Sequence, residues 1–180
     1  MIRLALCGAS GTGKSTIAEA IAAQLSLPIC PVGSRSVAAS MGFDNPYDVD
    51  AAGKRSEFQR ALLSQKIAWE REVGAFVTDR THLDNLAYTL MHAHETADEG
   101  FRTAVRAAMP IYTHIVFCPV DAFHNLAGDP ARVNDVLYHS DYQRRLRRLL
   151  NEYVDHTPIL WLTSKWRDTR IEQVRRFVRP

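Results

Sequence analysis

Gly8-Ala9-Ser10-Gly11-Thr12-Gly13-Lys14-Ser15 is the stretch that decides how this chain of 180 residues folds. It matches the pattern G-x-x-x-x-G-K-[ST] at every fixed position. It also lies between an apolar run, Ile2 to Cys7, and a segment of helical period, Lys14 to Leu25. A strand, a glycine-rich turn and a helix in this order are the setting in which the pattern forms a phosphate-binding loop. The sequence therefore predicts a site for the polyphosphate of ATP or a related nucleotide.

Each part of this loop has an expected role in holding phosphate. Glycine tolerates sharp backbone turns, so successive N–H groups converge on phosphate oxygens, and the start of the helix adds its positive dipole end. We expect Lys14 to reach the β- and γ-phosphates and Ser15 to place its hydroxyl on Mg²⁺. The predicted ATP-binding residues are Gly8, Ala9, Ser10, Gly11, Thr12, Gly13, Lys14, Ser15 and Thr16.

On both sides of this loop, short apolar runs alternate with longer segments of helical period. The apolar runs predict five strands, at residues 2–7, 28–32, 75–78, 111–118 and 158–162. Helices are expected at 14–25, 34–41, 54–73, 83–92, 97–109, 140–154 and 168–178, with loops at 42–53 and 121–139. A parallel crossover needs the length of a helix, so the alternation indicates an α/β fold, a three-layer sandwich with a five-stranded parallel sheet. Ligands bind at the carboxyl ends of such strands.

Length and composition are those of an ordinary globular domain. The chain is predicted to form one domain, residues 1–180, with 46% hydrophobic and 23% charged residues. No apolar run approaches the roughly 18 residues that a membrane span needs, so we expect a cytoplasmic protein without a membrane partner. The three cysteines lie far apart and outside any CxxC pair, which does not indicate a disulfide framework or a zinc site.

The charge is unevenly distributed along the chain. Residues 1–130 hold 11 Lys and Arg against 14 Asp and Glu, a net charge of −3, and residues 131–180 hold 11 against 6, a net charge of +5. A basic last third suits a partner that carries phosphates, nucleic acid included. It is equally consistent with a set of solvated helix faces.

A second element complements the loop at residues 75–79. Ala75-Phe76-Val77-Thr78 is an apolar strand that ends in Asp79, as a Walker-B element does. Such an aspartate holds Mg²⁺ opposite the loop hydroxyl, so Ser15 and Asp79 are the predicted metal ligands. Arg80 follows at the carboxyl edge of the sheet, where a fixed cation suits an acceptor phosphate or hydroxyl.

These residues carry a resemblance to a known family. Asp79-Arg80-Thr81, followed by Asp84 and Tyr88, resembles the Asp-Arg-Ser/Thr element of the thymidylate-kinase-like P-loop kinases. The stretch Asn45-Pro46-Tyr47-Asp48-Val49-Asp50, then Phe58-Gln59 and Glu70, is similar to the AAA-like small kinases typical of phages and of nicotinamide-riboside kinase domains. The resemblance implies a P-loop phosphotransferase acting on a nucleoside, a nucleotide or nucleic acid, with a mobile lid. It does not identify the acceptor.

The acceptor class depends on the residues after the second predicted strand. Deoxynucleoside kinases tend to carry a catalytic carboxylate there, but this chain has Gly33-Ser34-Arg35-Ser36 and no acid before Asp44. Arg35 resembles the acceptor-phosphate clamp of thymidylate kinases, and a phosphate acceptor needs no general base. We therefore expect a (deoxy)nucleoside monophosphate or a related nucleotide. The predicted substrate-binding residues are Arg35, Asp44, Gln59 and Arg80, with Gln59 or Gln65 paired to a base edge.

Two alternatives stay open. One is a hydroxyl acceptor, namely a nucleoside, nicotinamide riboside, or a hydroxymethylated base or end in DNA, with Asp44 or Asp79 as base. The other is a nucleotide-dependent switch or motor. A guanine-specific switch would carry an Asn-Lys-x-Asp element after the fourth strand, where this chain has Cys118-Pro119-Val120-Asp121.

A lid-like segment is expected at about residues 121–148. The corresponding loop of related kinases closes over the donor phosphates and supplies an arginine that neutralises the transferring group. Arg132 is the predicted residue, with Arg144 or Arg148 on the following helix as substitutes. The predicted catalytic residues are Lys14, Asp79, Arg80 and Arg132.

Overall fold

The computed structural model describes residues 1–120 and 135–179. Within these ranges, four parallel strands form one sheet in the order β2-β1-β3-β4. The strands are β1 (Arg3–Cys7), β2 (Phe76–Asp79), β3 (His114–Phe117) and β4 (Ile159–Trp161). Leu6 lies opposite Asp79, and Cys7 lies opposite Phe117. The carboxyl ends of these three strands therefore meet at one edge, next to the glycine-rich loop.

The second predicted strand, at residues 28–32, is wrong as a strand, because this segment forms only one bridge, between Ile29 and Val77. The N–H of Cys30 donates to the Val77 carbonyl, and the N–H of Val77 donates to the Pro28 carbonyl. Pro28 has no N–H with which to extend the ladder further back, and Pro31 restricts φ where the chain turns toward the next helix. The segment still runs parallel to β2, with which it pairs through this bridge.

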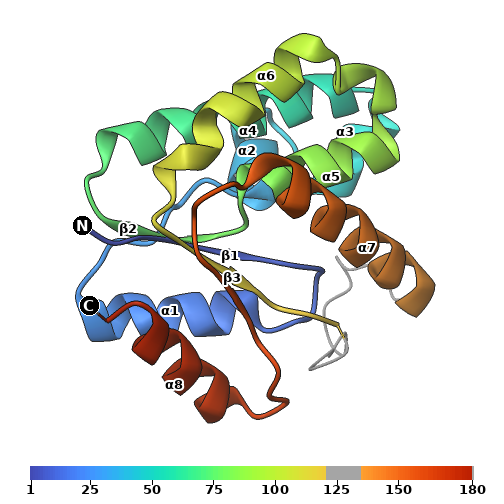
Figure 1. Ribbon diagram of the computed structural model, residues 1–180. Helices are drawn as coiled ribbons and strands as arrows, with labels where there is room; N and C mark the ends of the chain where they lie inside the picture. Colours follow the sequence, from blue (N-terminus) through green and yellow to red (C-terminus); the bar gives the residue numbers. More distant parts are fainter. Residues whose placement is uncertain (121–134, 180) are drawn as a thin grey trace.

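Helices cover both faces of the sheet (Figure 1). On one face lie α1 (Lys14–Leu25) and α8 (Arg167–Phe177); the other face carries α4 (Arg55–Glu72), α5 (His82–His92), α6 (Glu99–Ala108) and α7 (Val136–Tyr153). The remaining elements are α2 (Ser34–Ser40), α3 (Pro46–Ala51) and two short 3₁₀ turns, His94–Thr96 and Met109–Ile111. The predicted three-layer α/β architecture is confirmed.

Strand alternation explains the two cores. Leu4 and Leu6 of β1 point into a cluster with Ile17 and Ile21 of α1, whereas Ala5 and Cys7 belong to the cluster beneath the opposite helices. Successive side chains of a strand face opposite sides, so a strand covered on both faces is apolar throughout. No helix in residues 1–120 and 135–179 combines the length and apolar character that crossing a membrane requires.

Two predicted loops contain helix. Residues 42–53 were expected to be irregular, but α3 begins at Pro46, and the Asn45 side chain accepts hydrogen bonds from the N–H groups of Tyr47 and Asp48. An asparagine cap followed by proline in the first turn is a helix-start signal. Likewise, α7 begins at Val136 after an Asp135 cap, and not at residue 140 as expected.

Candidate active site

The glycine-rich loop Gly8–Ser15 connects β1 to α1 with backbone angles that require glycine. Gly8, Gly11 and Gly13 have φ values of 136°, 76° and 79°, all in the region that L-residues rarely adopt. A Cβ added at Gly8 would lie 2.4 Å from the carbonyl oxygen of Cys118, the residue just after β3. The first glycine is therefore needed both for its φ value and for the close approach of the neighbouring chain.

The N-terminus of α1 adjoins the loop, and no side chain caps it. Gly13 occupies the cap position, so no side chain accepts a hydrogen bond there, and the first turn contains no acidic residue. The first N–H groups of a helix have no intrahelical partner, and they carry the positive end of the helix dipole. This end of α1 can bind an anion.

Lys14 lies folded over the loop. Its Nζ donates to the Ala9 carbonyl at 2.6 Å and to Thr12 Oγ1 at 3.4 Å, and the side chain is 5% exposed. Burial and the neighbouring Arg80 guanidinium lower the pKa of Lys14. The ammonium group therefore sits in the loop's concave face, where a phosphate oxygen would relieve its desolvation.

Ser15 and Asp79 meet as predicted, on the loop and on the end of the neighbouring strand. Ser15 Oγ donates to Asp79 Oδ2 at 2.5 Å. Burial raises the pKa of Asp79, but Lys14, Arg80 and the Ser15 hydroxyl outweigh it, so the pKa is lowered and the carboxylate stays ionised. Asp79 Oδ1 is buried and has no hydrogen-bond partner among the described residues. A hydroxyl and a carboxylate with one unpartnered oxygen form a donor set that suits Mg²⁺.

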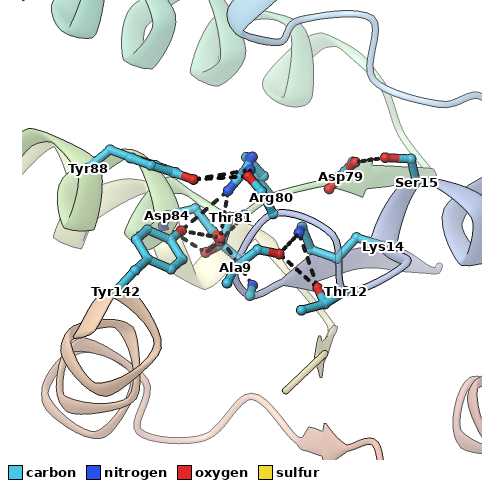
Figure 2. Close-up of polar contacts among 12 residues, drawn as sticks. Ala9, Thr12, Lys14, Ser15, Asp79, Arg80, Thr81, Asp84, Tyr88 and Tyr142 are labelled. Atoms are coloured by element: carbon cyan, nitrogen blue, oxygen red, sulfur yellow. Dashed lines mark hydrogen bonds and ion pairs between the residues drawn. The ribbon is translucent and has the colours of Figure 1, made fainter. Parts of the chain in front are cut away.

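Arg80 lies between the loop and the helices α5 and α7 (Figure 2). Its Nη2 donates to Ser10 Oγ at 3.2 Å and to Tyr88 Oη at 3.5 Å, and its Nη1 donates to Tyr142 Oη at 3.4 Å. The guanidinium lies 5.0 Å from the centre of the Tyr88 ring. Arg80 is thus held at the border of the glycine-rich loop by contacts with the loop itself, α5 and α7.

Asp84 is a further charged residue of this centre, and it was not among the predicted site residues. Its buried carboxylate accepts hydrogen bonds from the Gly8 N–H, from Thr81 and from Tyr142 Oη. With Thr81 it forms a capping box at the start of α5. The spacing Thr-x-x-Asp is a capping signal visible in the sequence, but the contacts with Gly8 and Tyr142 are not.

The loop opens into a cleft of about 780 Å³, within the range of small-molecule sites. Loop residues form one wall, and the other walls come from residues 30–36, α3, α5 and the start of α7. Lys14, Arg35, Arg55 and Arg80 bring positive charge to this cleft. Asp79 is the one carboxylate among its described lining residues.

The other predicted acceptor residues lie elsewhere. Gln59 is 3% exposed between α4 and α5, where its Oε1 accepts from Asn85 Nδ2 at 2.8 Å, and it does not line the cleft. Asp44 and Gln65 are exposed and are also outside the described lining. Arg132 lies outside the described residues. Arg144 and Arg148 are exposed on α7 and do not line the cleft either.

Aromatic side chains also line the cleft. Tyr88 and His92 stand one turn apart on α5, with ring centres 6.2 Å apart and nearly parallel planes. His92 Nε2 lies 2.8 Å from Tyr138 Oη of α7, and Tyr47 borders the same cleft from α3. Burial and Arg55 lower the pKa of His92, so its ring is uncharged at neutral pH. This part of the cleft suits a planar ring.

Comparison with protein families identifies the chain. The family model described as an AAA domain matches residues 3–166. The chain belongs to this AAA domain family. No curated protein matches it.

Solved structures place this AAA domain protein in the fold of the P-loop kinases. Deoxyadenosine kinase from M. mycoides is similar with a TM-score of 0.67 and 14% identity, over 98% of each chain. Shikimate kinase from Aquifex aeolicus has a TM-score of 0.61 and 13% identity, over 96% of this chain and 94% of that one. Thymidylate kinase from Candida albicans has a TM-score of 0.53 and 18% identity, over 98% and 91%. The predicted resemblance to P-loop kinases is confirmed at the level of the fold.

Proposed function

We propose that this protein is a kinase that transfers a phosphoryl group from ATP, with Mg²⁺, to a nucleoside monophosphate or a related nucleotide. The observation that carries the proposal is the composition of one cleft. It joins a glycine-rich loop, a Ser15–Asp79 pair and two guanidinium groups, those of Arg35 and Arg80.

The loop is the donor half of the site. Backbone N–H groups of Ala9 to Thr16 and the uncapped start of α1 would bind the ATP phosphates. The Lys14 ammonium group would exchange its hydrogen bond to the Ala9 carbonyl for one to a phosphate oxygen, and this gives the desolvated cation an anionic partner. Ser15 and Asp79 would hold Mg²⁺, which when bound neutralises charge on the donor phosphates.

The acceptor half supports a substrate that is itself anionic. A hydroxyl acceptor needs a base, and a phosphate acceptor does not. Asp79, the single carboxylate of the described cleft lining, is bonded to Ser15 and belongs to the metal position. Arg35 and Arg80 supply donors suited to phosphate oxygens. Tyr88 and His92 line the cleft, so a nucleobase can pack against their rings.

A second candidate is transfer to a neutral hydroxyl, as in a nucleoside, nicotinamide riboside, or a hydroxymethylated base or end in DNA. The observation that favours it is His92, an uncharged imidazole in the cleft that can accept a proton. Deoxyadenosine kinase, one of the similar structures, has a nucleoside as the substrate in its name.

The experiment is an acceptor panel. The chain is incubated with Mg²⁺ and γ-labelled ATP and, separately, with nucleoside monophosphates, nucleosides, nicotinamide riboside, and DNA carrying hydroxymethylated bases or free 5′ ends. Labelled diphosphate products support the first proposal. Label on a nucleoside, on nicotinamide riboside or on DNA supports the second, and phosphate release without any acceptor indicates a switch or motor.

A variant of Arg35 tests the acceptor side of the cleft directly. Arg35→Ala should raise the KM of the monophosphate at least about tenfold while leaving the KM of ATP unchanged, because a charged hydrogen bond contributes roughly 1.5–3 kcal/mol. Arg176→Ala is the matched control, since Arg176 lies on α8, pairs with Glu172 and is on the opposite face of the sheet. An unchanged acceptor KM in Arg35→Ala would remove this arginine from the acceptor site.

A further inference from the structure

Asp84 is a buried carboxylate whose two oxygens have different partners. Oδ2 accepts from the Thr81 N–H at 2.8 Å and from Thr81 Oγ1 at 2.7 Å. Oδ1 accepts from Tyr142 Oη at 2.7 Å and from the Gly8 N–H at 3.2 Å, and it lies 3.5 Å from Arg80 Nη1. The side chain is fully buried. It therefore has contacts with the phosphate loop, with the turn after β2 and with α7 at the same time (Figure 2).

The oxygen on the Thr81 side fixes the turn that presents Arg80. Arg80 has φ 82°, in the left-handed region that residues other than glycine seldom occupy. Its N–H donates to the Leu6 carbonyl at 2.7 Å, and the next residue is the cap of α5. A backbone conformation of this kind persists only where the surroundings impose it. Here the capping box of Thr81 and Asp84 follows immediately, and it closes the turn.

The other oxygen joins the donor and acceptor halves of the site. Gly8 begins the phosphate loop, Arg80 borders the cleft, and Tyr142 lies on α7, the helix that follows residues 121–134. Burial and the Asp84 carboxylate raise the pKa of Tyr142, so its hydroxyl stays protonated and donates. One negative charge is thus shared by three donors from three parts of the chain.

We infer that Asp84 is a positioning residue: it sets the start of the phosphate loop through Gly8 and aims the Arg80 guanidinium into the cleft. This role rests on the proposed phosphoryl transfer, to which Arg80 contributes. Asp84 itself touches neither reactant, because its side chain is buried behind the loop and the arginine.

Asp84→Asn tests this with almost no change in shape. The amide keeps one acceptor oxygen and replaces the other by an NH₂ donor, and every neighbour of the carboxylate is itself a donor. Either orientation of the amide places two donors face to face. We expect kcat for transfer to fall at least about 100-fold, and the ADP affinity to fall about tenfold through the contact with Gly8.

A double-mutant cycle with Arg80→Ala separates positioning from a general loss of structure. If Asp84 acts on turnover through Arg80, the kcat of the double variant equals that of Arg80→Ala alone. Losses that multiply in the double variant, or a kcat of Asp84→Asn within threefold of the wild type, would overturn the proposal. Asp98→Asn is the matched control, because Asp98 also bonds to an N–H in the first turn of a helix, α6, but has no contact with the loop.

Two further measurements keep the test decisive. If Asp84→Asn fails to fold, Tyr142→Phe removes the hydroxyl that joins Asp84 to Arg80, since it donates to Asp84 Oδ1 and accepts from Arg80 Nη1. We expect a three- to tenfold lower kcat in the wild-type background and no such difference in the Arg80→Ala background; an unchanged kcat overturns the proposal. If the wild type transfers phosphate to no acceptor, the proposed function fails, but calorimetric titration with ADP still decides the contact with Gly8. Equal ADP affinity in the wild type and in Asp84→Asn would then overturn the inference.

Discussion

Gly8→Ala is expected to destabilise the protein by a large amount, because the loop crosses the neighbouring chain at close range. The added methyl carbon would lie 2.4 Å from the Cys118 oxygen and 3.2 Å from its carbonyl carbon. That carbonyl cannot move aside freely, because residue 118 is anchored by a hydrogen bond: its N–H donates to the Cys7 carbonyl oxygen at 2.9 Å. In addition, φ at residue 8 is 136°, a strained value for alanine.

The expected magnitude follows from these two effects. Backbone strain of this kind costs roughly 1–3 kcal/mol, and forcing an extra carbon into a packed site costs roughly 1–3 kcal/mol. Together they lower the free energy of unfolding by about 2–6 kcal/mol. For a chain of this size, about 2–4 °C of Tm is lost per kcal/mol, so the Tm should fall by about 4–24 °C. ADP binding should weaken as well, since the loop is displaced.

Gly42→Ala is the control that isolates the clash. Gly42 has φ 85° and no atom within 4 Å of an added Cβ, so only strain remains, roughly 1–2 kcal/mol. Both variants are followed by thermal unfolding and by titration with ADP. A Tm for Gly8→Ala equal to that of Gly42→Ala, with unchanged ADP affinity, would refute the argument from close approach.

Three other predictions concern charge. Lys14→Ala should reduce phosphoryl transfer at least about 10³-fold in a turnover assay, because the cation that stabilises the phosphate charge is lost. The Tm should change little, because the variant removes a desolvated cation together with its hydrogen bonds. Arg132→Ala should lower kcat by about 10³-fold or more and change ATP affinity less, as expected for an arginine that stabilises transition-state charge; equal kcat would shift that role to Arg144 or Arg148. Burial lowers the pKa of His82. Burial raises the pKa of Glu70, but the hydrogen bond from His82 and the charge of Lys66 outweigh it, so the pKa of Glu70 is also lowered. The unfolded chain therefore binds protons first, so stability should fall as the pH drops below about 6.5, and further below about 4.5; His82→Gln should show a smaller decrease of Tm between pH 7.5 and 5.5.

Local chemistry made part of this protein predictable from its sequence. The glycine-rich loop, its flanking strand and helix, and the contact between Ser15 and Asp79 were all found where the sequence indicated. Glycine spacing limits the backbone directly, and a parallel strand order brings strand ends to one edge. The start of α3 was also encoded locally, by Asn45 and Pro46, although the surrounding polar residues favoured a loop prediction.

Tertiary structure decided what no local pattern contains. Gln59 faces α5 and not the cleft, since the rotation of a helix is set by the packing of its apolar face. Asp84 and Tyr142, 58 positions apart, meet only because α7 packs beside α5. The sequence thus determined the shape of the glycine-rich loop, a backbone property of adjacent residues, whereas the other walls of the cleft depend on side chains that folding alone brings together.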